Sequence, residues 1–193
     1  MNNRVVHYGE KVFDFLAITI ILNLSMILVL PFVPMVFGVH LFLVTTPEQR
    51  SLKQLFVPLR DNPRVVLYTT FFLLLVVSVG YLNLYYLEIT NTFVMWLIHG
   101  TTYIILFVAL LVFINGPTIQ NHMTVSFRQL LYNSLTLPLG GIIHTLTSIG
   151  ILTIYVYGAS RHYLFLVFGI PFAMYFVANL SYSNLLKLKE RLK

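Results

Sequence analysis

Side chains that could do chemistry are scarce in the apolar part of this chain. The ionisable candidates are Asp14, near the start of the first long apolar segment, and the histidines His40, His99 and His144. The histidines lie in different segments and lack the HxxxH or HxxE spacing that would place two ligands on one helix face, so a metal site has little support. The alternative for each histidine is a hydrogen bond to a neighbouring helix.

Known catalytic motifs are also absent from the sequence. It contains no GxSxG, HExxH, P-loop or GxGxxG pattern, and it has no cysteine, which excludes a thiolate nucleophile, a thiolate metal site and a disulfide framework. Serine and threonine within membrane helices more often bond to backbone or to neighbouring helices than act as nucleophiles. We therefore predict no enzyme activity, no catalytic residue, no metal and no cofactor.

The composition places most of the chain in lipid. Hydrophobic residues make up 58% of the 193 residues and charged residues only 9%, whereas soluble domains average about 25% charged residues. The net charge of +6 fits an excess of Lys and Arg in cytoplasmic loops better than nucleic-acid binding. We predict an all-α, polytopic membrane helical bundle in the cell membrane, formed as a single domain over residues 1–193.

Four windows have the roughly 20 apolar residues that a membrane span needs. They are Val65–Tyr86, Phe93–Phe113, Leu135–Tyr157 and Tyr163–Leu180. A fifth apolar region, Val12–Val44, is too long for one straight crossing. Pro31 and Pro34 predict a helix break within it, because proline removes a backbone donor and clashes with the preceding turn.

The number of crossings depends on this broken region. It forms either one long kinked helix that crosses once, or a hairpin whose short return arm is Met35–Val44. In the hairpin arrangement eleven of the twelve Lys and Arg residues face the cytoplasm, and in the other arrangement nine do. Six crossings are therefore favoured over five, and in both cases the C-terminus is cytoplasmic.

Two short basic segments of one design lie between the spans, "SLKQLF" at residues 51–56 and "SFRQLL" at residues 126–131. Thr46 as N-cap, with Pro47 and Gln49, predicts the start of the first helix. Each helix then carries an apolar stripe beside a basic residue and lies on the cytoplasmic interface, against anionic lipid or a partner protein. The predicted interface residues are Leu52, Lys53, Leu55, Phe56, Leu59, Phe127, Arg128, Leu130 and Leu131.

A constant offset of 75 residues relates the two basic segments and also pairs Pro63 with Pro138. This suggests an internal duplication with repeat-like halves at about residues 31–86 and 93–157, flanked by a first and a last span.

Small residues line one face of the third window. Gly141, Thr145 and Ser148 predict a helix-packing surface, either inside the protein or against a partner.

The stretch "LNLSMILVLPFVPMVFG" at Leu22–Gly38 resembles the N-terminal signature of the YesL-like integral membrane proteins, a bacterial family of unknown function. The shared features are a Leu-Asn-Leu in an apolar helix, a Leu-Pro break and a glycine that opens the next helix. The basic segments at residues 50–64 and 128–131 also resemble those of the family. Genes of this family often lie beside genes for carbohydrate ABC importers and glycan-degrading enzymes.

This resemblance implies an accessory or regulatory subunit that binds the permease subunits of a bacterial carbohydrate ABC importer, with the ATPase as a further contact. The alternative is a small secondary transporter or channel-like protein, whose site would lie near the broken first helix and include Asn23, His40, His99 or His144. An intramembrane enzyme is a third alternative, disfavoured by the near absence of ionisable groups from the spans.

Overall fold

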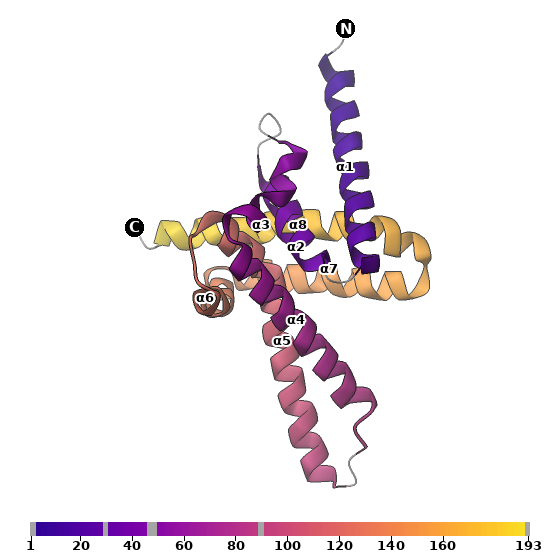
Figure 1. Cartoon of the computed structure of the whole chain (residues 1–193), viewed down its shortest axis with the longest axis vertical. Helices are drawn as coiled ribbons and strands as arrows, with labels where there is room; N and C mark the ends of the chain where they lie inside the picture. The colour runs from indigo at the N-terminus through magenta and orange to yellow at the C-terminus, as the bar shows by residue number, and fades with distance from the viewer. Residues whose placement is uncertain (1–2, 29–30, 46–49, 89–90, 192–193) are drawn as a thin grey trace.

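The computed structural model describes residues 3–28, 31–45, 50–88 and 91–191. Within these ranges the regular secondary structure is all helical, with eight α-helices, one short 3-10 helix named η2, and no strand (Figure 1). In chain order the elements are α1 (Asn3–Leu28), α2 (Phe32–Val44), η2 (Leu52–Phe56), α3 (Val57–Asp61), α4 (Pro63–Tyr85), α5 (Thr92–His122), α6 (Phe127–Gly140), α7 (Ile142–Arg161) and α8 (Tyr163–Arg191).

Four of these helices, α4, α5, α7 and α8, are long and apolar enough to cross a membrane. The structure is therefore compatible with the multi-helix membrane protein that the composition predicts. The helix α4 agrees closely with the predicted window Val65–Tyr86, whereas α5 continues past the predicted end at Phe113 and α8 continues past Leu180. Polar residues end the hydropathy window in α5 without ending the helix, because their side chains are buried against other helices.

The first apolar region is divided at the predicted place. The helix α1 ends at Leu28, and Pro31 is the N-cap of α2. Pro34 lies in the first turn of α2, where its missing N–H would have no partner within the helix. With 13 residues, α2 is about 20 Å long, which is shorter than a hydrocarbon core of about 30 Å.

The short helix α2 forms the centre of the molecule. Nine of its thirteen residues are buried, and it packs against α1, η2, α3, α4, α5 and α8. Phe42 belongs to one apolar cluster, shared with α1 and α8, and Phe37 belongs to a second, shared with α4, α5 and α6. The predicted return arm of the hairpin, Met35–Val44, is thus part of a core helix. The count of six membrane crossings stays a prediction.

The predicted span Leu135–Tyr157 is interrupted, so this boundary is wrong. The helix α6 ends at Gly140, Gly141 has a non-helical backbone with φ −163° and ψ 74°, and α7 begins at Ile142. Asn184 of α8 lies against Gly141, and its side-chain amide leaves no room there for a Cβ atom. Apolar composition alone gives no sign of this break, although Pro138 and the pair Gly140 and Gly141 are local helix-breaking residues.

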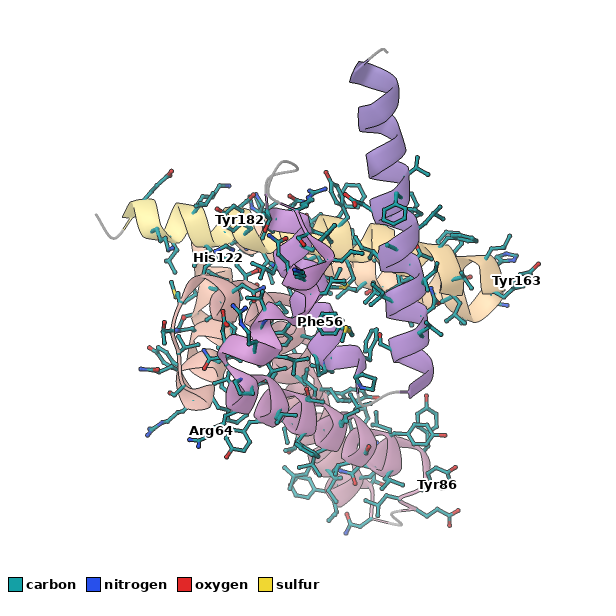
Figure 2. All side chains as sticks on the ribbon, turned by 45° about the horizontal axis from the view of Figure 1, so that its top comes forward. Phe56, Arg64, Tyr86, His122, Tyr163 and Tyr182 are labelled. Carbon is teal, nitrogen blue, oxygen red and sulfur yellow. The ribbon has the colours of Figure 1, made fainter. Side chains whose placement is uncertain are left out.

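Two hairpins diverge from the core. The α4–α5 hairpin and the α7–α8 hairpin point in different directions, and both views show the two pairs crosswise (Figures 1 and 2). Arg64, at the start of α4, lies at the opposite end of that hairpin from Tyr86, and Tyr163 lies at the far tip of the other hairpin (Figure 2). The outer parts of both hairpins expose large apolar side chains, which lipid or a partner can cover.

Candidate functional site

The first basic segment is the 3-10 helix η2, followed directly by α3. Ser51 is its N-cap and accepts a hydrogen bond from the backbone N–H of Lys53 at 3.4 Å. The described helix begins at Leu52, and Arg50 and Ser51 are not helical. The predicted cap residues Thr46, Pro47 and Gln49 lie outside the described residues.

The apolar stripe of this segment does not face a single surface. Leu55 is 1% exposed and packs in the core beside α2, and Leu59 packs on the second apolar cluster. Leu52 and Phe56 are 43% and 56% exposed. A 3-10 helix has three residues per turn, so successive side chains such as Leu55 and Phe56 point about 120° apart. The interface prediction is therefore limited to Leu52, Lys53 and Phe56, which are exposed.

The second basic segment opens α6 with a capping box. The backbone N–H of Ser126 donates to Gln129 Oε1 at 2.9 Å, and the Gln129 N–H donates to Ser126 Oγ at 3.4 Å. Leu130 is fully buried in the second apolar cluster, which Leu131 also contacts. Leu130 therefore contacts the protein's own core instead of the predicted lipid or partner, whereas Leu131 is only partly buried and its predicted contact stays a prediction.

The other two predicted residues of this segment lie closer to the surface. Phe127 is half-buried, with its ring centroid 6.1 Å from that of Tyr68 and 5.9 Å from that of Phe72. Arg128 is exposed and stays a candidate for contact with anionic lipid or a partner.

The small-residue face of α7 packs inside the protein. Thr145 and Ser148 are 5% and 1% exposed. Asn184 Nδ2 donates to Thr145 Oγ1 at 3.3 Å, and the same side chain lies against Gly141. The sequence left open whether this face packs inside the protein or against a partner. Thr145 packs inside the protein, against Asn184 of α8.

A buried polar chain at the molecular centre joins α2, α5 and α8. His40 Nε2 lies 2.8 Å from Thr118 Oγ1, Thr118 Oγ1 lies 2.7 Å from Ser181 Oγ, and Ser181 Oγ lies 3.1 Å from Asn115 Oδ1. Asn115 Nδ2 then donates to the Ser134 carbonyl of α6 at 3.3 Å. The four linked side chains are at most 1% exposed.

The hydrogen-bond chemistry orients this polar chain. An amide oxygen can only accept, so Ser181 donates to Asn115 and must accept from Thr118. Thr118 in turn accepts from His40, which places a proton on His40 Nε2. His40 Nδ1 is buried and has no hydrogen-bond partner among the described residues.

The sequence pointed to His40 but not to its partners. Asn115, Thr118 and Asn121 recur every third residue, which places them along the inner side of α5, where Asn121 Nδ2 donates to the Phe37 carbonyl at 3.1 Å. That spacing could have extended the predicted helix beyond Phe113.

The remaining polar candidates do not join this chain. Asn23 Nδ2 donates to the carbonyls of Thr19 and Val167, and His144 Nε2 lies 3.4 Å from Lys187 Nζ. His99 lies on α5, and its Nε2 atom has no hydrogen-bond partner in the described part of the chain. No group of three or more His, Cys, Asp or Glu residues that could hold a metal ion occurs among the described residues.

A partly buried ion pair lies at the C-terminal end of α2. Arg50 Nε donates to the Thr45 carbonyl and Arg50 Nη2 to the Leu43 carbonyl, both at 3.1 Å. Arg50 Nη1 lies 3.8 Å from Asp14 Oδ2 of α1, and the two side chains are 18% and 28% exposed. The guanidinium thereby caps the last carbonyls of α2 and joins α2 to α1.

No protein-family model, no curated protein and no solved structure matches this chain.

Proposed function

We propose that this protein is a non-enzymatic accessory subunit that binds the permease of a bacterial carbohydrate ABC importer through its outward-facing helices. The sequence resemblance supplies the type of partner. The observation that carries the proposal is the outer face of α7, whose apolar window is only 11% buried within the protein.

This outer face has the residues of a helix contact. Gly150 is exposed in mid-helix, and among the described residues no atom beyond the adjoining helix backbone lies within 4 Å of the place where its Cβ would be. Thr147, one turn before it, is also exposed. Lipid does not require small residues, and a mid-helix glycine costs about 1 kcal/mol relative to alanine, whereas close approach by another membrane helix favours glycine.

The exposed basic residues supply a second contact. Lys53, Arg60, Arg64 and Arg128 are all exposed, and the enrichment of such residues in these loops supports a cytoplasmic location for them and for the C-terminus. In this arrangement they contact the cytoplasmic loops of the permease, its ATPase, or anionic lipid.

Copurification in mild detergent tests this function. The permease should be recovered with a tagged copy of the protein. Gly150→Leu should lower that recovery about tenfold, since loss of a close helix contact worth about 1.4 kcal/mol changes binding by that factor. Ile154→Leu is the matched control, because Ile154 is 65% exposed on the same helix and the change conserves volume.

The outcome separates a partner from lipid. If α7 faces only lipid, Gly150→Leu leaves recovery unchanged and raises stability by removing a helix glycine. Recovery of the protein alone, under conditions that keep the importer intact, would refute the accessory role.

A small secondary transporter is the second candidate, and the polar chain from His40 to Asn115 beside the broken first region favours it. Transporters often place polar groups of broken helices around a central site. Uptake by the purified protein in liposomes, lost in Thr118→Val, would support transport. Absence of uptake with the sugars of the associated importer would leave the accessory role as the better account.

A further inference from the structure

The Asp14–Arg50 pair lies in the wall of a cavity of about 380 Å³ between α1, the C-terminal end of α2, and α8. The charged groups form one part of the lining, and aromatic side chains of all three helices form much of the rest. The aromatic residues are Phe15, Phe42, Phe172 and Tyr175. A volume of this size is typical of a small-ligand pocket.

The guanidinium is already oriented for a ligand. Two of its nitrogens are held by the Thr45 and Leu43 carbonyls, and its plane lies near the Phe42 ring, with Cζ 5.5 Å from the ring centroid. The remaining nitrogen, Nη1, lies 3.8 Å from Asp14, which is longer than a hydrogen bond. A phosphate oxygen in the cavity can therefore accept from this nitrogen, and arginine is well suited to phosphate.

An apolar groove shares one lining residue with this cavity. It lies between α7 and α8, has a volume of about 620 Å³, and is lined almost entirely by apolar atoms. Phe172 lines both the cavity and the groove, so the two adjoin at this residue. A charged compartment followed by an apolar one has the chemical order of a lipid headgroup and its acyl chain.

We propose that this pair of compartments binds one phospholipid with an ethanolamine headgroup. The phosphate contacts Arg50 Nη1, the primary ammonium donates to the Asp14 carboxylate, and one acyl chain passes Phe172 into the groove. A zwitterionic headgroup satisfies both charges, whereas an anionic lipid would leave Asp14 facing negative charge. A choline headgroup has no N–H to donate to the carboxylate.

The test uses the single tryptophan of the chain. Trp96, which is 70% exposed on α5, is changed to Phe, and Phe172→Trp places a reporter where the two compartments meet. The full-length protein is reconstituted in phosphatidylcholine vesicles with rising fractions of brominated phosphatidylethanolamine, phosphatidylglycerol or phosphatidylcholine. Half-maximal quenching should need a several-fold lower fraction of the ethanolamine lipid than of the other two.

Charge variants make the test specific. Asp14→Asn should abolish the preference for ethanolamine and shift it toward phosphatidylglycerol, because the remaining Arg50 then favours an anion. Asp61→Asn is the matched control, since it makes the same change at an exposed carboxylate that pairs with Arg60 outside the cavity, and it should leave the quenching curves unchanged.

Three results would overturn the proposal. The first is equal quenching by the three lipids in the reporter protein, and the second is a lipid preference that Asp14→Asn does not change. The third is relief of quenching by soluble phosphoethanolamine as effective as that by unbrominated phosphatidylethanolamine, because the headgroup alone would then be the ligand. The measurement needs no partner protein and is independent of the proposed accessory role.

Discussion

Gly38 provides a sharp test of the central packing. It lies on α2 against the backbone of η2, and a Cβ there would lie 2.6 Å from the carbonyl carbon of Leu55 and 2.7 Å from its Cα. Carbon atoms in contact normally lie about 3.5–4.0 Å apart, so Gly38→Ala must move η2 by about 1 Å. Leu55, which is 1% exposed, moves with it and opens the core.

The magnitude follows from two opposing effects of Gly38→Ala. Overpacking costs about 1–3 kcal/mol, and replacing a helix glycine by alanine recovers up to about 1 kcal/mol. We expect a net loss of about 1–2 kcal/mol, or roughly 2–8 °C in melting temperature for a chain of this size.

Thermal unfolding in detergent, measured as loss of the monodisperse peak after heating, checks this value. Gly100→Ala and Gly150→Ala are the controls, because no described atom beyond the adjoining helix backbone lies within 4 Å of a Cβ at either position, and both should melt at or above the wild-type temperature. If Gly38→Ala also melts at or above that temperature, the close contact between α2 and η2 is not what places Leu55.

Three further substitutions test the core, a helix cap and the buried polar chain. Leu130→Ala should cost about 2–5 kcal/mol, because the side chain is fully buried, and a melting temperature close to that of Leu139→Ala, at a 69% exposed position, would contradict this burial. Ser126→Ala removes the capping box and should cost about 1 kcal/mol, measured as faster amide hydrogen exchange in the first turn of α6. Thr118→Val keeps the side-chain shape but leaves His40 Nε2 without its partner, so a loss of about 1–3 kcal/mol is expected, and wild-type melting would argue against the chain.

Hydropathy was sufficient where a helix ends at a change from lipid-like to polar residues. The window Val65–Tyr86 differs from α4 by only two residues at its start and one at its end, since Arg64 and Glu88 flank it with charge. The helix break near Pro31 was also predictable from the sequence, because the missing N–H and the fixed φ of proline act on the local backbone. Hydropathy failed for α5, where buried Asn115 and Thr118 continue the helix within the core.

The two basic segments show a different limit. Apolar spacing predicted both short helices, whereas capping chemistry was predicted only for the first, at Thr46, Pro47 and Gln49, which lie outside the described residues. The capping box of Ser126 and Gln129 in α6 is a finding of the structure. Periodicity cannot distinguish an apolar stripe on lipid from one on the protein's own core, because both need the same residues. The tertiary structure decided this by placing Leu55 and Leu130 beside α2 and α5.

The sequence by itself determined the helical class, the four long apolar helices and the divided first region, because these follow from composition and from local backbone chemistry. Only the tertiary structure decided that Asn184 lies against Gly141, that His40 meets Thr118 and Ser181, and that Asp14 and Arg50 share a cavity with Tyr175. Each of these contacts joins residues far apart in the chain. They depend on how α8 packs against α1, α2, α5 and α7, which no local pattern in the sequence specifies.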